Sequence, residues 1–134
     1  MDEQDCVKSD VALACFIRAA LRGLLASGAE LLPHEILVKD FHTVIKDGLN
    51  AKVSSPHGKT ARQICQYYFN IATEYADGDE KEYLWLVKRR IEEGNLSELI
   101  RAKVQARAGK TSFQEATVNV YSTLIKCLRN NQPF

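Results

Sequence analysis

The sequence predicts an all-α fold of about six helices, arranged as an antiparallel helical bundle or array. Two observations support this class. Apolar residues recur three and four positions apart along most of the chain, which is the spacing of one face of a helix. Glycines and capping patterns, the usual signals of helix ends and starts, separate these segments. With 134 residues, 46% of them hydrophobic and 26% charged, the chain has the size and composition of one domain spanning residues 1–134.

The first helix is expected to run from Ser9 or Asp10, either of which would cap it, to about Ser27. Gly28 follows as a stop signal, and residues 1–8 are expected to be a frayed lead-in. Apolar residues are so dense in this segment that its apolar face would be wide. We therefore expect this helix to be buried against several neighbouring helices.

The second helix is expected over residues 34–47, with Pro33 at its first turn and Gly48 at its end. Its apolar residues are expected to face inward: Ile36, Leu37, Phe41, Val44 and Ile45. The connection that follows, residues 49–58, contains a turn signal. Residues 51–54 could be extended, but no alternating segment offers itself as a second strand, so no sheet is expected.

The rest of the chain contains repeated capping-box patterns, in which a polar side chain and a Glu or Gln three positions later bond each other's backbone. Each pattern predicts the start of a helix. The pattern at Thr60 opens a helix to about Ala76, and the pattern at Ser112 opens a last helix to about Asn130. The patterns at Asp79 and Asn95 precede two amphipathic helices, Tyr83 to Glu93 and Leu96 to Ala108. Residues 131–134 form a tail that cannot continue the last helix.

Composition excludes several classes of function. The net charge of +1 predicts no strong attraction to nucleic acid or to an anionic membrane. Charged residues interrupt the longest apolar stretch, so no membrane-spanning helix is expected. The four cysteines are scattered and none has metal-ligand spacing to a histidine, which predicts reduced thiols of a cytoplasmic protein and no metal site. No nucleophile, base and orienting group come together, so we name no catalytic residue.

The sharpest charge feature is a basic cluster in residues 88–110: Lys88, Arg89, Arg90, Arg101, Lys103, Arg107 and Lys110. Some of these residues could converge on a phosphate or carboxylate. The favoured alternative is that they are solvated helix faces offset by neighbouring glutamates, because most surface charge clusters contribute little beyond their solvation. Trp85, the only tryptophan, would indicate an interface if its side chain is exposed.

Several short stretches, in this order, resemble one known family. They are Asp10–Ala14 (DVALA), Asp47–Ala51 (DGLNA), Ser55–Gly58 (SPHG) before Ala61 and Arg62, and Glu93–Asn95 (EGN) followed by Arg101 and Arg107–Gly109 (RAG). With them, residues 11–134 resemble the helical C-terminal portion of carboxylate–amine ligases related to bacterial glutamate–cysteine ligases of the second type.

The resemblance implies an ATP- and Mg²⁺-dependent joining of a glutamate-like carboxylate to an amine, on an antiparallel sheet that precedes this helical portion. This chain lacks that sheet, so it would need no cofactor on its own and would act by binding a protein partner or a small-molecule ligand. The family's arginine-rich motifs are reduced here to Lys46 and Arg101, which we therefore name as ligand-binding candidates. The alternative is a helical interaction or regulatory protein unrelated to the ligases, and self-association into a homo-oligomer stays open for both.

Overall fold

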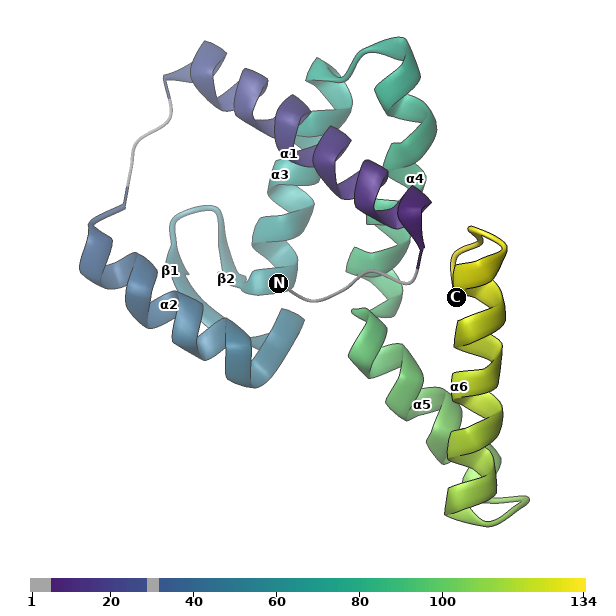
Figure 1. Cartoon of the computed structure of the whole chain (residues 1–134). Helices are drawn as coiled ribbons and strands as arrows, with labels where there is room; N and C mark the ends of the chain where they lie inside the picture. The colour runs from purple at the N-terminus through teal and green to yellow at the C-terminus, as the bar shows by residue number, and fades with distance from the viewer. Residues whose placement is uncertain (1–5, 29–31) are drawn as a thin grey trace.

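The computed structural model describes residues 6–28 and 32–134 and confirms a predominantly α-helical array (Figure 1). The described residues form six α-helices, one 3-10 turn and a two-stranded hairpin. The elements are α1 (Val7–Ser27), α2 (His34–Asp47), η1 (Gly48–Asn50), β1 (Lys52–Ser55), β2 (Gly58–Thr60), α3 (Ala61–Tyr75), α4 (Gly78–Glu93), α5 (Leu96–Ala108) and α6 (Phe113–Arg129).

Helix α1 begins earlier than predicted. Its N-cap is Cys6, so Ser9 lies inside the first turn, where it is buried and within hydrogen-bond distance of the Cys6 thiol (3.4 Å). The expected cap at Ser9 or Asp10 was therefore wrong, as was a frayed chain at residues 7–8; residues 1–5 of that lead-in lie outside the described residues. The error has a physical source, because an acidic residue in a first helical turn is as favourable as one at a cap.

The prediction that residues 51–54 have no strand partner was also wrong. Strand β1 pairs with β2 in an antiparallel hairpin, with Lys52 opposite Thr60 and Ser55 opposite Gly58 around a tight turn. Asp40 on α2 accepts hydrogen bonds from the Ser54 backbone N–H (2.7 Å) and hydroxyl (3.2 Å), so the hairpin is tied to α2. Strands of three and four residues are too short to show an alternating pattern.

The capping boxes at the starts of α3 and α5 form as predicted, and the box at the start of α6 forms in part. Thr60 and Gln63 bond each other's backbone N–H groups at the start of α3, and Asn95 and Glu98 do the same at the start of α5. At the start of α6, the Ser112 hydroxyl accepts from the backbone N–H three residues later (3.2 Å). Local polar chemistry thus determines where these helices begin.

The capping box of helix α4 begins two residues before the predicted one. Asp77 is the N-cap, and the Glu80 carboxylate accepts from the Asp77 backbone N–H at 2.8 Å. The pattern predicted from Asp79 was therefore shifted. The run of acidic residues offers overlapping cap signals, and the two arginines on α1 that bind Glu80 favour the earlier one.

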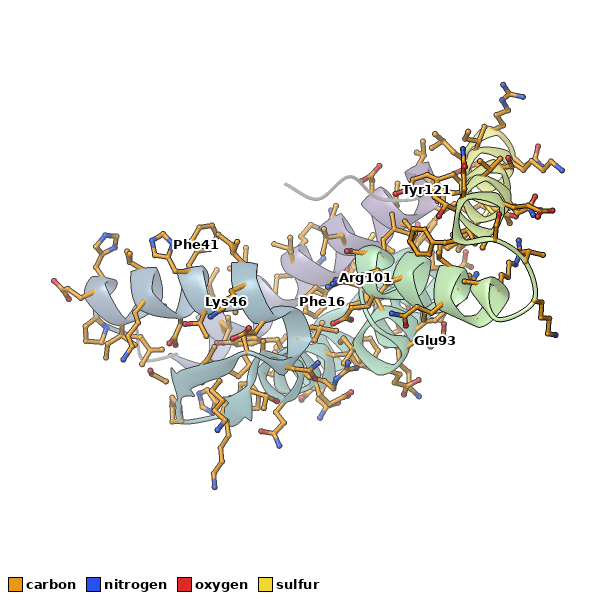
Figure 2. All side chains as sticks on the ribbon, turned by 90° about the horizontal axis from the view of Figure 1, so that it is seen from below. Phe16, Phe41, Lys46, Glu93, Arg101 and Tyr121 are labelled. Carbon is orange, nitrogen blue, oxygen red and sulfur yellow. The ribbon has the colours of Figure 1, made fainter. Side chains whose placement is uncertain are left out.

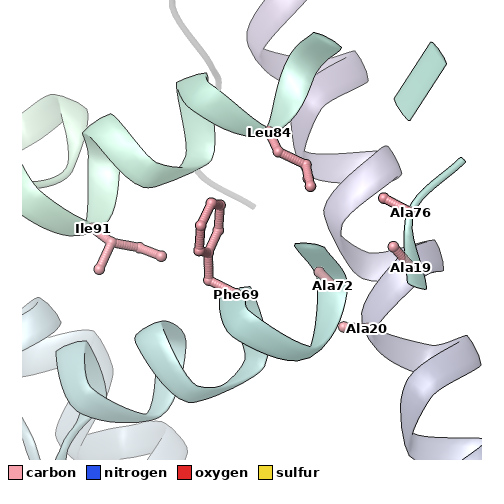
Figure 3. Close-up of a cluster of buried hydrophobic side chains, with 7 residues drawn as sticks. All are labelled: Ala19, Ala20, Phe69, Ala72, Ala76, Leu84 and Ile91. Atoms are coloured by element: carbon pink, nitrogen blue, oxygen red, sulfur yellow. The ribbon is translucent and has the colours of Figure 1, made fainter. Parts of the chain in front are cut away.

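The main core lies where α1 crosses α3 and α4, and it is built largely from small side chains (Figure 3). Its buried members are Ala19, Ala20, Phe69, Ala72, Ala76, Leu84 and Ile91. A Cβ atom on Gly23 would overlap Ile71 Cγ2, so the backbone of α1 lies very close to the side chains of α3. Small residues permit this close packing, and each contributes little buried apolar area.

A second core joins α5 to α6, which lie side by side and extend away from the other helices (Figure 1). Its buried members are Val104, Ala116, Val120 and Phe134. Two hydrogen bonds hold the C-terminal end of this pair to the rest of the chain. The Lys8 backbone N–H donates to Asn131 (3.0 Å), and the Arg89 guanidinium donates to the Phe134 carbonyl (3.1 Å).

Burial of the first two helices differs from the prediction. No residue of α2 is buried, and Leu37, Phe41, Val44 and Ile45 are exposed rather than inward. Helix α1 does not bury a wide apolar face either, because it packs on α3 and α4 while large residues on its other side are exposed: Val7, Val11, Leu13, Ile17, Leu21 and Leu25. Helical periodicity indicated where the two helices run, but nothing local specifies which of their apolar residues are covered.

Candidate functional site

A pocket of about 500 Å³ lies where α1, α4 and α5 meet, with single contributions from η1, α3 and α6. Most of its lining is apolar. The largest apolar contributors are Leu13, Phe16, Leu49, Leu86, Ile91 and Ile100. Concave, mainly apolar sites of this size that contain a few polar groups are the usual form of small-molecule sites.

Two arginines bring positive charge to this pocket. Arg101, on α5, is exposed and donates from Nε to the Ser97 carbonyl (3.3 Å) and from Nη2 to the Ser97 hydroxyl (3.2 Å). Arg90, on α4, lines the same pocket and is half-buried. In Figure 2, Phe16 and Arg101 lie between Phe41 on one side and Tyr121 on the other. The pocket therefore combines an apolar wall with guanidinium groups, a combination suited to an organic anion.

The two ligand-binding candidates from the sequence are placed differently. Arg101 lines the pocket, whereas Lys46 is an exposed residue of α2 and is not part of the pocket lining. Figure 2 shows the two residues on different helices of the molecule. The structure therefore does not bring Lys46 and Arg101 into one pocket, and a binding role for either stays a prediction.

Three members of the basic cluster make contacts with other side chains of this chain. Lys88 pairs with Glu92 (3.8 Å) and Arg89 with Glu93 (2.8 Å), each one helical turn away. Lys103 lies over the Phe134 ring, with Nζ 3.7 Å from the ring centroid. These contacts favour the interpretation of solvated, locally balanced helix faces for these three residues, and Arg90 and Arg101 are the members of the cluster that line the pocket.

Trp85 projects from α4 with 53% of its surface exposed and does not line the pocket. Its predicted role at an interface is untested, but the exposure on which that prediction depends is present.

Several pocket residues carry no local signal of their role. Phe16, Cys65 and Tyr121 come from α1, α3 and α6, and only the packing of these helices brings them together. Burial raises the pKa of the Cys65 thiol, with nearby Arg62 opposing the shift. The thiol therefore stays protonated at neutral pH and is a poor nucleophile.

A second polar cluster, also unforeseen, connects α1 to the start of α4. Arg18 and Arg22 both contact Glu80 and Asp77, and the Glu80 side chain is only 4% exposed. Hydrogen bonding from the Asp77 backbone N–H, together with the two arginines, lowers the pKa of Glu80. The charges in this cluster satisfy one another, so it is a connection between helices and not an open site.

The described residues offer neither a metal site nor a membrane span. Within residues 6–28 and 32–134, no three His, Cys, Asp or Glu side chains gather in a way that could hold a metal ion, and all four cysteines there are free. Over the same ranges, no helix combines the length and apolar character needed to cross a bilayer.

A protein of Archaeoglobus fulgidus, described only as uncharacterized, is 32% identical to this chain over 134 residues. The match covers all of this chain but 32% of the relative, so the chain spans about a third of that relative's length. No model of a known protein family matches the sequence, and no solved structure matches it.

Proposed function

We propose that this chain is a non-catalytic helical domain, similar to the C-terminal region of ATP-dependent carboxylate–amine ligases, that binds a small organic anion. The observation that carries the proposal is the pocket between α1, α4 and α5, with Arg90 and Arg101 in its lining. Its size suits a small metabolite, and its apolar wall would remove a bound molecule from water.

The chemistry of the lining favours a carboxylate. A guanidinium matches a carboxylate with two parallel hydrogen bonds, and such pairs strengthen where water is scarce. A glutamate-like ligand would agree with the resemblance to the ligases, whose substrates carry this group. ATP and Mg²⁺ would belong to the catalytic sheet portion of such a ligase.

Support for binding without catalysis comes from the titratable groups in the pocket. Cys65, the thiol in the lining, has its pKa raised by burial, and a guanidinium group offers hydrogen-bond donors but no acceptor. Such groups hold and orient an anion but do not exchange protons with it near neutrality.

The test is calorimetric titration of the protein with glutamate and, separately, with ATP. Arg101→Ala should weaken binding of the anion at least tenfold. The matched control is Arg107→Ala, because Arg107 is an exposed arginine of the same helix that does not line the pocket. Absence of heat with the unmodified protein for both ligands would contradict the proposal, and so would equal losses in the two variants.

A second candidate function is that of a protein-interaction or regulatory module. It is favoured by the apolar face of α2, where Phe41 is 63% and Ile45 is 67% exposed. Exposed apolar residues gathered on one face mark sites of association in monomeric proteins. Fluorescence of an apolar dye should rise on binding this face and fall in Phe41→Ser. Failure of the unmodified protein to bind the dye would argue against this function.

A further inference from the structure

Helix α6 carries two apolar faces, and only one of them belongs to a core cluster of the described residues. The first packs against α5 through Ala116, Val120, Leu124 and Cys127. The second consists of Val118, Tyr121, Ile125 and Leu128, which are between 49% and 59% exposed. We call these four residues the α6 stripe. Figure 1 shows α6 at the edge of the molecule, beside α5.

The spacing of the α6 stripe is that of a helix–helix seam. Its members follow one another at intervals of three, four and three residues, which is the repeat that keeps a side-chain row facing a partner helix. A solvent-facing helix surface does not need this repeat, and scattered exposed apolar residues would not show it. The partner that fits such a row is another helix lying nearly parallel or antiparallel to α6.

Charges beside the stripe select the partner and its direction. Glu115 lies in the first turn of α6 and Arg129 in the last, and with Ser122 they occupy the same position of the repeat. Neither Glu115 nor Arg129 forms an ion pair among residues 6–28 and 32–134. In a parallel pair of α6 helices, Glu115 of one copy and Arg129 of the other would lie at opposite ends of the pair and could not form an ion pair.

An antiparallel pair brings the two charges together. With a two-fold axis near Ser122, Glu115 of one copy would face Arg129 of the other, and the same pair would form a second time. The apolar residues would match as well, with Val118 beside Leu128 and Tyr121 beside Ile125. A contact between identical surfaces that closes on itself is the usual form of a homodimer interface.

We propose that α6 is a self-association surface that pairs antiparallel with α6 of a second copy of this chain. The inference names the partner for an interaction function of the kind proposed above, and it does not depend on the α2 face or on the pocket. One helix pair buries less surface than a standard stable interface, so the dimer should be weak, with a Kd in the micromolar range.

Sedimentation equilibrium over about 1 to 500 µM tests the dimer directly. The unmodified protein should shift from monomer to dimer across this range, and Ile125→Glu should raise the dimer Kd at least tenfold. Ile45→Glu is the matched control, since it places the same change on an exposed isoleucine of α2 and should leave the Kd unchanged. Far-UV circular dichroism establishes that both variants are folded.

A charge exchange tests the antiparallel direction. Glu115→Arg alone and Arg129→Glu alone should each weaken the dimer several-fold, because each sets like charges against one another twice. The double variant should recover most of the lost affinity. Recovery in the double variant is specific to pairing between two copies, because an unrelated partner would not change its charges to match.

Three results would overturn the inference. A protein that stays monomeric to the highest concentration has no such dimer, whatever the apolar dye reports about α2. A dimer lost in Ile45→Glu and kept in Ile125→Glu uses α2 instead. Losses that add up in the double charge variant exclude the antiparallel direction. None of these results would decide whether an anion binds in the pocket, which the calorimetric titration tests separately.

Discussion

Arg22 on α1 holds both carboxylate oxygens of Glu80 on α4, with one Nη2 atom 2.8 Å from Oε1 and 2.7 Å from Oε2. The same carboxylate accepts from the Asp77 backbone N–H (2.8 Å), so it closes the first turn of α4 while it anchors α1. Arg18 adds a further contact to Oε1. One buried acid thus serves as a helix cap and as a connection between helices.

We predict that Glu80→Gln lowers the melting temperature at neutral pH, because the two arginines lose their charged partner. The pKa of Glu80 is lowered in the folded protein, chiefly by the Asp77 N–H and then by the arginines. Its stabilising contribution is therefore present above the ordinary pKa of 4.5 and is lost as pH falls through the lower folded value.

The measurement is thermal unfolding, followed by circular dichroism, at several pH values from about 7 down to about 3. The gap in melting temperature between the unmodified protein and Glu80→Gln should narrow as the solution becomes acidic. Glu82→Gln, at an exposed position of the same helix, should show almost no gap at any pH. A gap that stays constant through the acid range would refute the electrostatic account of Glu80.

Gly23→Ala should destabilise the protein, because the new Cβ would overlap Ile71 Cγ2 and would meet Tyr75 Cδ2 at 2.9 Å. Overpacking of a close helix crossing typically costs about 1–3 kcal/mol, measured here by urea unfolding. Gly78→Ala is the control, since a Cβ atom at that position would have no neighbour within 4 Å among the described residues. Equal stability of the two variants would show that α1 and α3 can separate without cost.

Asn95→Ala should cost about 1 kcal/mol of unfolding free energy, because the Asn95 side chain accepts from the Glu98 backbone N–H at 2.9 Å and caps α5. Asn119→Ala removes the same group from an exposed, mid-helix position of α6 and should cost nothing. Urea titration compares the two. The capping role would be refuted by an unaffected midpoint in Asn95→Ala.

Fluorescence can measure the exposure of Trp85, because Trp85 is the only tryptophan. With 53% of its surface exposed, its fluorescence should be quenched efficiently by iodide, which does not penetrate folded proteins. If Trp85 lies at an interface, quenching should weaken as protein concentration rises. Strong protection in the dilute protein would instead show that α4 is covered by something within the same chain.

Helix positions could be predicted from the sequence because their signals are local. Thr60, Asn95 and Ser112 each determine a start through a hydrogen bond spanning three residues, and these starts were confirmed. The hairpin could not be predicted, because β2 is three residues long and too short for a period to appear. Burial could not be predicted either, since Phe41 and Val104 were both expected to face inward and only Val104 is covered.

The candidate site also contains residues that the sequence predicted and residues that it did not. Arg101 was reached through the family resemblance, and the structure places it in the pocket lining. Phe16, Cys65 and Tyr121 meet there only because α1 crosses α3 and α4 while α5 folds back on α6. Because these side chains are far apart in the chain, no sequence pattern indicates that they line one pocket. Lys46 is the opposite case: the family resemblance predicted a ligand-binding role for it, but it does not line the pocket.

Tyr121 lines the pocket and also lies in the middle of the α6 stripe. A ligand in the pocket and a second copy at α6 would therefore both contact Tyr121. If ligand binding changes the dimerisation constant by some factor, dimerisation must change ligand affinity by the same factor, because the two equilibria form a closed thermodynamic cycle. A single aromatic side chain could thus make the amount of bound ligand depend on protein concentration.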